Sequence, residues 1–451
     1  MKVNKYIETD KKFYIDLVKI ALPVALQSLI TTGVNMVDNI MLGQLGEIAM
    51  NGAYFANQFI MLFTFLCMGI SMGSSVMTSR FYGAKDQVSL KKVISIALRF
   101  SFFLALLFTI INVLGGRGIM SLYTPEGRIV EAGTSYLYWS TSTYILMALS
   151  TVLTNIMRSI GMSIVPIVAS AISFGINIFA NYCFIFGKFG CPEMGVAGAA
   201  LGTVIARIIE TLVILLFFLY RNKVVKFRAK DLFTSTKDMV PEYIKIALPV
   251  LFSDGLLGVG ENVLASIMGH ISDEFVSANS ITMVVSRAST IVITGIAFSG
   301  CFLTGKTLGE GRRKDAEKQG WTMLYIGVAV GLIAALIIEI VAHPIIESYK
   351  ITEETKGIAY SLMNALALII VFRSTNSILT KGVLRGGGDT RFLLVADMTS
   401  KWLLGIPLGY LAGIKMSLPM FWVFLFLHVD DIVKAIWSVC RMKSGKWIKK
   451  I

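Results

Sequence analysis

The sequence predicts an all-α membrane protein with twelve transmembrane helices, arranged as two six-helix lobes related by pseudo-two-fold symmetry about the membrane normal. Three observations predict this fold. The chain is 55% apolar with a mean hydropathy of +0.71. Only 16% of its residues are charged, against roughly 25% in a soluble protein. A motif near the beginning of the chain also recurs in the second half.

The charged residues are bunched, and the stretches between the bunches are apolar and long. About 20 apolar residues in a helix cross the roughly 30 Å hydrocarbon core of a bilayer. Backbone groups in lipid must bond within their own segment or in a closed barrel, and the alternating pattern of a barrel is absent. Twelve helices are therefore expected near residues 14–42, 53–79, 93–114, 133–157, 164–187, 195–219, 243–269, 277–304, 321–342, 359–384, 392–412 and 418–440.

The formal net charge of +14 could suggest a nucleic-acid-binding protein. We reject that interpretation because the basic residues lie in short loops between apolar spans. The two tails and the loops on their side of the membrane hold 30 Lys and Arg, and the opposite side holds six. This bias predicts cytoplasmic termini in a bacterial cell membrane. We expect no cleaved signal peptide, since the first 13 residues are polar.

An internal repeat supports the two lobes. The pentapeptide Ile20-Ala-Leu-Pro-Val24 recurs as Ile246-Ala-Leu-Pro-Val250, and Gly83 and Gly309 have the same offset of 226 residues. Six spans per half is an even number, so both halves enter the membrane from the same side, as parallel repeats do. We therefore expect an N-terminal lobe over residues 1–220, a cytoplasmic linker over 221–242 and a C-terminal lobe over 243–451.

Each half carries a proline inside its first span, Pro23 and Pro249. A proline removes a helix hydrogen bond and bends the helix. Pro23 is therefore a candidate hinge. A static kink accommodated by neighbouring helices is an equally good interpretation of the sequence.

The first span also carries a polar stripe. Gln27, Thr31, Asn35 and Asp38 follow one another at spacings of four, four and three, which places them on one helix face. A carboxylate within a span usually faces a cavity or a partner, and it can hold either a small cation or a proton. A carboxylate that caps or pairs with a neighbouring segment is the alternative.

The fifth and sixth spans offer neutral oxygen atoms. Ser173, Asn177 and Asn181 are spaced by four residues, and Thr203 follows the small residues that open the sixth span. Such oxygen atoms suit a hard cation such as Na⁺. Hydrogen bonding and close packing between helices would explain the same residues.

The second half is charged differently. Asp254 and Glu261 lie seven residues apart on one face of the seventh span. Because opposite charges in lipid tend to pair, we expect a network of ion pairs with the other in-span charges, Arg287, Arg373, Asp397 and Lys401. The alternative is that Glu261 or Asp254 provides an additional coupling or substrate site, and Gln27 and Asn35 of the first span are further candidates for that role.

These landmarks, taken in order, resemble the multidrug and toxic compound extrusion (MATE) family over essentially the whole chain. The resemblance is carried by Ala21-Leu-Pro23, Val34-Asn-Met-Val-Asp38 with Gly43, Ser79-Arg-Phe-Tyr-Gly83-Ala-Lys-Asp86, Arg158 with Gly161, Asn177-Ile-Phe-Ala-Asn181, Gly195-Val-Ala-Gly-Ala199 and Leu384-Arg-Gly-Gly-Gly-Asp-Thr390.

The resemblance implies a central cavity and alternating access driven by Na⁺ or H⁺. It also implies a cation site at Asp38, Asn177 and Thr203. One difference concerns Asn181, where some members of the family carry an aspartate, so the site here would hold one carboxylate. One branch of the family uses a glutamate of the seventh helix and an acidic residue of the tenth. Glu261 lies near the position of that glutamate in the sequence, and the predicted tenth span contains no acidic residue.

We therefore expect an antiporter that exports small organic cations in exchange for Na⁺ or H⁺, acts as a monomer and binds no cofactor or nucleic acid. A flippase for lipid-linked sugars is the main alternative, since Arg287, Arg373 and Lys401 could bind an anionic headgroup. An integral-membrane enzyme is disfavoured because the chain's three histidines, His270, His343 and His428, show no metal-ligand spacing.

Overall fold

The computed structural model describes residues 7–221, 224–349 and 351–449. Asn222 of the expected linker lies outside these ranges, and so do five of the basic residues counted above: Lys2, Lys5, Lys223, Lys350 and Lys450. Every regular element within the described ranges is helical, which confirms the all-α prediction.

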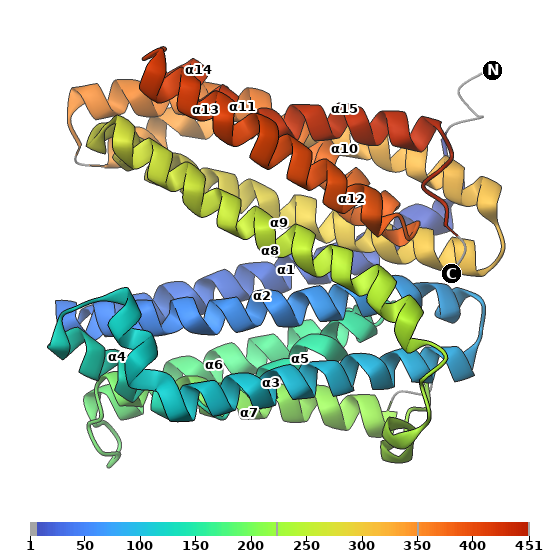
Figure 1. The fold of residues 1–451 in the computed structure, drawn as a ribbon, viewed down its shortest axis with the longest axis horizontal. Coiled ribbons are helices and arrows are strands. Elements are labelled where there is room, and N and C mark those ends of the chain that lie inside the picture. The colour runs from blue at the N-terminus through green and yellow to red at the C-terminus, as the bar shows by residue number, and fades with distance from the viewer. Residues whose placement is uncertain (1–6, 222–223, 350, 450–451) are drawn as a thin grey trace. The chain divides into compact units, whose positions relative to one another are not determined.

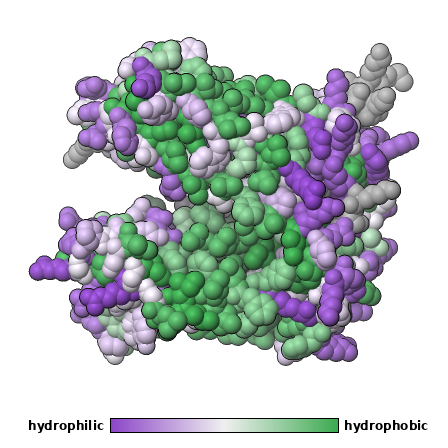
Figure 2. All heavy atoms as spheres, viewed as in Figure 1, coloured by the Kyte–Doolittle hydropathy of each residue, from purple (hydrophilic) through white to green (hydrophobic). Residues whose placement is uncertain are grey.

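Ten helical segments of the described chain are long and apolar enough to cross a membrane. On the face seen in Figure 2, hydrophobic side chains cover the middle of the long helices of each unit, and hydrophilic ones gather at their ends. The segments are α1 (Lys11–Gly43), α2 (Glu47–Gly83), α3 (Gln87–Tyr123), α6 (Ile164–Phe186), α7 (Val196–Leu216) with the π turn after it, α8 (Val240–Ile271), α9 (Asp273–Gly309), α10 (Arg313–Ser348), α11 (Glu353–Ser377) with its following π turn, and Thr390–Lys415.

The expected single helix over residues 133–157 is wrong, because the structure has two helices there. These are α4 (Gly127–Trp139) and α5 (Thr143–Arg158). Hydroxyl groups at the junction compete for backbone carbonyls, with Ser140 Oγ donating to the Tyr136 carbonyl at 2.7 Å. Asn112 of α3 donates to the Leu137 carbonyl at 2.8 Å and holds the break in place.

The expected helix over 418–440 is also interrupted. It consists of α14 (Met420–Leu427) and α15 (Val429–Lys443), and the buried His428 lies between them. The preceding segment is helical throughout but has widened turns: α12 (Thr390–Asp397) and α13 (Ile406–Tyr410) are each followed by a π turn. Single π turns inside helices often accompany functional positions.

The chain divides into two compact units, and the division does not fall at one point in the sequence. The amino-terminal unit contains Pro23–Thr78 and Asp86–Ala247. The carboxy-terminal unit contains Met1–Leu22, Ser79–Lys85 and Leu248–Ile451. Figure 1 shows α1 and α8 as long continuous helices. Each of them passes from one unit to the other within its copy of the repeated Ile-Ala-Leu-Pro-Val motif.

The repeated glycines explain why the ends of α2 and α9 pack closely within the carboxy-terminal unit. A Cβ atom on Gly83 would lie 2.1 Å from the Lys306 carbonyl oxygen. A Cβ atom on Gly309 would lie 2.0 Å from the carbonyl oxygen of Arg80. Arg80 and Lys306 are themselves related by the repeat. The two helix ends therefore make a pair of equivalent contacts, in which the glycine of each helix faces a carbonyl group of the other.

The linker between the halves is bound to the start of α3 in the amino-terminal unit. Lys91 pairs with Asp231 at 2.9 Å, and Lys92 pairs with Asp238 at 2.6 Å. The Arg99 guanidinium donates to linker carbonyls, including that of Thr234 at 2.7 Å. The described part of the linker is therefore attached along its length to one helix.

The attachment of the linker is expected to weaken only in acid. The bond from Lys92 lowers the pKa of Asp238. Burial acts to raise the pKa of Asp231, but the bonds from Lys91 and from the backbone N–H of Arg228 outweigh it, so that this pKa is lowered as well. A carboxylate with a lowered folded pKa stabilises the folded state above its unfolded pKa and loses that contribution as the pH falls through the folded value.

Hydrogen exchange of residues 224–239, corrected for intrinsic rates, should therefore show constant protection from pH 8 to 5 and lose it below about pH 4. Lys92→Met should reduce the protection at neutral pH. Protection that declined steadily between pH 8 and 5 would contradict this account.

Candidate cation site

The polar stripe of α1 does not act as a unit in the structure. Gln27 is buried, whereas Thr31 and Asn35 are exposed and Asp38 is half-buried. The Thr31 hydroxyl donates back to the Gln27 carbonyl at 3.0 Å, and Asn35 makes no side-chain hydrogen bond with any described residue. Among the described residues, Asp38 is the member of the stripe whose side chain is hydrogen-bonded to an asparagine of the fifth predicted span.

Asp38 lies against two buried asparagines of α6. Asn181 donates from Nδ2 to Asp38 Oδ1 at 2.5 Å, and the same nitrogen lies 3.4 Å from Asn177 Oδ1. Asn177 and Asn181 are 2% and 0% exposed, because this face of α6 packs against α7. The amide nitrogen of Asn181 therefore bridges a carboxylate oxygen and a carbonyl oxygen.

Within the described residues, no Lys, Arg or His side chain forms a salt bridge with Asp38. Its neighbours are amides, and the guanidinium of Arg207 acts on it electrostatically without closing an ion pair. The carboxylate thus has neutral hydrogen-bond donors around it, which distinguishes it from the acids of the second half described below.

Gly202 of α7 determines where the Asn181 side chain lies. A Cβ atom at Gly202 would be 2.1 Å from Asn181 Oδ1 and 3.0 Å from its backbone nitrogen. Asn181 Oδ1 is buried on this side and has no hydrogen-bond donor among the described residues. The adjacent Thr203 donates to the Ala199 carbonyl at 3.1 Å, which leaves the lone pairs of its hydroxyl oxygen available.

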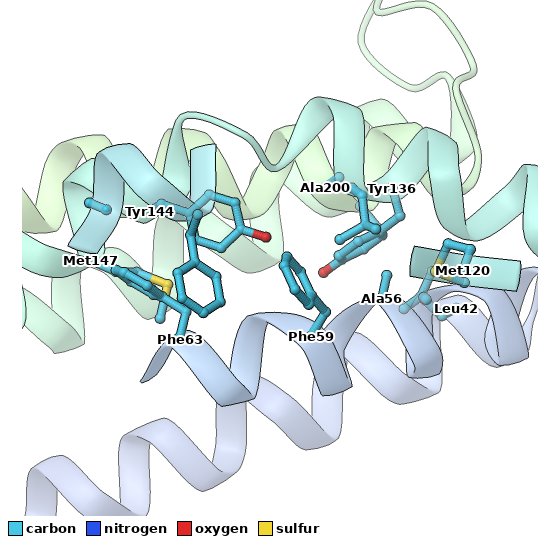
Figure 3. Packing of buried hydrophobic residues seen from close by; sticks show 14 of the residues in the cluster. Leu42, Ala56, Phe59, Phe63, Met120, Tyr136, Tyr144, Met147 and Ala200 are labelled. Carbon is cyan, nitrogen blue, oxygen red and sulfur yellow. The ribbon is translucent and has the colours of Figure 1, made fainter. Parts of the chain in front are cut away.

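Tyr136 of α4 is a further neighbour of this site, and no motif in the sequence marks it as one. It is 4% exposed, its hydroxyl lies 3.5 Å from Asn57 Oδ1, and it interacts with Thr203 and with the charge of Asp38. Figure 3 shows the ring beside Phe59 in the apolar core of the amino-terminal unit. The break after α4 places it there, and the cluster of hydroxyl residues at 140–143 was the sequence signal for that break.

A second missed group is the ion pair within α7. Glu210 is 7% exposed, and its Oε2 accepts from Arg207 at 2.7 Å. Two opposite charges three residues apart within an otherwise apolar span would have been a sufficient signal in the sequence.

The acids of the carboxy-terminal unit are paired, as the favoured interpretation of their charges expected. Asp254 pairs with Arg385 at 3.0 Å, and Glu261 pairs with Lys401 at 2.9 Å. The remaining charges continue the network, since Arg373 pairs with Asp431, and Lys434 pairs with Asp430 and Asp397. Arg287 is exposed and forms no ion pair with a described residue. Asp254 and Glu261 thus have cationic partners within the carboxy-terminal unit, and Gln27 is hydrogen-bonded to Ser170 and Arg158.

Comparisons with known proteins show which chains this one is similar to. The chain is 24% identical over 439 residues to a probable multidrug resistance protein NorM of Thermotoga maritima, covering 96% of this chain and 93% of that protein. It is 23% identical over 454 residues to the multidrug resistance protein MdtK of Yersinia enterocolitica, covering 96% and 95%.

A solved structure, described as the outward-facing conformation of a multidrug resistance MATE family transporter, matches with a TM-score of 0.86 at 19% identity. The match covers 97% of this chain and 99% of that one. The family model described as MatE matches residues 23–183 and again residues 249–411. Two successive matches over most of the chain reproduce the internal repeat, and the chain belongs to the MatE family of membrane transporters.

Proposed function

We propose that the protein is a secondary active antiporter that exports small organic cations in exchange for Na⁺ or H⁺. The observation that carries this proposal is the half-buried Asp38, which lies in a membrane-spanning helix and has amide partners in place of an ion pair. A charged group in a span is costly unless something neutralises it, and an entering cation or proton would do so. The relatives named as multidrug resistance proteins support the substrate class.

The amide of Asn181 suggests how a metal cation would bind. Its nitrogen bridges the oxygen atoms of Asp38 and Asn177, at the place where a cation would bridge them. Rotating the amide would turn the buried Oδ1 towards the same point and add a third oxygen. We assign the fourth oxygen to Thr203, which follows Gly202 in the sequence. Na⁺ would use all four residues, whereas H⁺ needs Asp38 alone.

Cation entry and substrate export would be coupled because the charge of a single carboxylate, that of Asp38, changes when the cation binds. A ligand shifts a conformational equilibrium only through its different affinities for the two states. Neutralising Asp38 lowers the cost of enclosing it, and we propose that this bends α1 near Pro23, where the chain leaves one compact unit for the other. The alternating states would then release the cation inside and the substrate outside.

The finer architecture belongs to the same proposal. We assign twelve membrane crossings, with the interrupted pairs α4–α5 and α14–α15 each counted as one. The lobes would be residues 1–220 and 243–451 joined by the linker 221–242, in a monomer with cytoplasmic termini. The repeated contact between Gly83, Gly309 and their partners supports the pseudo-symmetry.

The ion-paired acids of the second half are assigned a structural role. Asp254 and Glu261 each have a cationic partner that would have to leave before a substrate could bind there. The same pairs weaken the flippase alternative, because Lys401 and Arg373 are already neutralised by acids.

Reconstitution into liposomes tests the function directly. With an imposed Na⁺ or pH gradient, the purified protein should drive uptake of a cationic dye, and dissipating the effective gradient should stop it. Comparing the two gradients identifies the coupling ion. Gradient-independent transfer of a fluorescent lipid-linked sugar, without dye uptake, would replace this proposal with the flippase.

A further inference from the structure

A second set of buried polar residues lies in the amino-terminal unit, one helical turn beyond Pro23. Gln27 of α1 donates from Nε2 to Ser170 Oγ of α6 at 2.9 Å, and Ser170 donates to Glu210 Oε1 of α7 at 2.8 Å. Arg158 of α5 donates to Gln27 Oε1 at 2.7 Å. Gln27, Ser170 and Glu210 are 8%, 6% and 7% exposed. One chain of hydrogen bonds thus ties α1 to three other helices.

This chain has a fixed direction, and Glu210 sets it. A serine hydroxyl has one proton, and the ionised Glu210 takes it, so Ser170 presents a lone pair to Gln27. Gln27 must then turn its NH₂ group to Ser170 and its carbonyl oxygen to Arg158, which can only donate. Arg207 keeps the second oxygen of Glu210 occupied at 2.7 Å. A donor in place of the Glu210 carboxylate would reverse the chain and leave Arg158 facing an NH₂ group.

The internal repeat places a similar junction in the carboxy-terminal unit. Ser253 lies four residues after Pro249, as Gln27 lies four after Pro23. Three further pairs are each 227 positions apart: Ser170 and Asp397, Arg207 and Lys434, and Arg158 and Arg385.

The contacts are similar in the two units, although they are not identical. Ser253 of α8 donates to Asp397, which pairs with Lys434 at 3.5 Å. Arg385 pairs with the neighbouring Asp254 at 3.0 Å. In both units, therefore, the side chain one turn beyond the proline is linked by hydrogen bonds to a carboxylate. The link is direct for Ser253 and passes through Ser170 for Gln27. In each case a cation on the sixth helix of that half pairs with the carboxylate.

We propose that Glu210 and Asp397 are positioning residues of the transport cycle, which fix the segments of α1 and α8 beyond their prolines through these two junctions. This inference rests on the proposed function, because it assigns the junctions to the movement that the cation site triggers. Neither residue belongs to the Asp38 site. Their expected influence is therefore on the rate of the conformational step, with little effect on binding of the dye.

The test uses the full chain in liposomes, with dye uptake measured against dye concentration at a fixed gradient. Glu210→Gln keeps the size of the side chain but adds a donor, and Ser170→Ala breaks the chain without touching the ion pair. Each should lower the maximal rate about two- to thirtyfold, with the half-saturating dye concentration unchanged. Glu354→Gln, at an exposed position, is the matched control and should transport as the wild type does.

A double-mutant cycle separates a junction from independent structural damage. Gln27→Leu disconnects α1, so adding Glu210→Gln to it should cost nothing further if both act through the same chain. Hydrogen exchange of α1 beyond Pro23 should also rise in Glu210→Gln. Wild-type rates in both single variants, additive losses in the cycle, or unchanged exchange would each overturn the inference. A wild type without gradient-driven uptake would instead overturn the proposed function, and the exchange comparison would still decide whether Glu210 holds α1.

Discussion

Asp38→Asn is expected to abolish the gradient-dependent part of dye uptake. The asparagine has nearly the same size and still offers an oxygen to Asn181, so the packing around α6 should be retained. It carries no charge, and no described Lys or Arg forms a salt bridge at this position that would be left unpaired. Without the carboxylate, neither Na⁺ nor H⁺ has a reason to prefer one conformation, and a ligand of equal affinity for both states shifts nothing.

The measurement is initial uptake with and without the gradient, on protein that elutes as the wild type does. Asp16→Asn is a suitable control, since it makes the same change on the same helix but in the segment that belongs to the carboxy-terminal unit. Gradient-driven uptake at the wild-type rate in Asp38→Asn would remove this residue from the mechanism.

Gly202→Ala is expected to impair coupling strongly although it adds only one methyl group. The new Cβ would be 2.1 Å from Asn181 Oδ1 and 3.0 Å from its backbone nitrogen, so turning the side chain would relieve the first contact but not the second. Overpacking of this kind costs about 1–3 kcal/mol. If that cost falls on the occupied site, cation binding should weaken by about 5- to 150-fold, as judged from the ion concentration for half-maximal uptake.

Gly175→Ala provides the comparison. Gly175 also lies within a helix, α6, and a Cβ atom there would meet nothing within 4 Å. Both changes improve helix propensity by about 1 kcal/mol, so any difference between them reflects packing. Equal ion dependence in the two variants would show that the position of Asn181 does not matter for coupling.

The sequence was most informative at polar or charged residues within a span, because the free-energy cost of placing such a side chain in lipid must be offset by a partner. Asp38, the spacing of Asn177 and Asn181, and the charges of the second half all stood out for that reason, and the structure gives a polar neighbour to Asp38, to both asparagines and to the acids of the second half. The spacing of a helix face was less reliable. Asn35 shares the spacing of Asp38 but is exposed, because spacing does not say which neighbouring helix covers a given turn.

The interrupted helices were not separated by mean hydropathy, although the hydroxyl residues 140–143 and the polar residues His428, Asp430 and Asp431 mark the two breaks. The break at Ser140 depends on local competition for carbonyl groups and on Asn112 from another helix. The role of Gly202 was also hidden. Its neighbours suggested close packing in general, but only coordinates show that the atom it accommodates belongs to Asn181.

The division of α1 at Pro23 bears on how the protein is made. Residues 11–22 leave the ribosome early, yet they belong to the carboxy-terminal unit, where the Leu17 carbonyl accepts from Ser299 Oγ at 3.0 Å. The backbone N–H of Glu8 likewise donates to Thr322 Oγ1 at 2.7 Å. These partners are synthesised roughly 300 residues later. Contacts of such long range form late and slowly. Residues 11–22 must therefore wait for these partners until α9 and α10 have been synthesised.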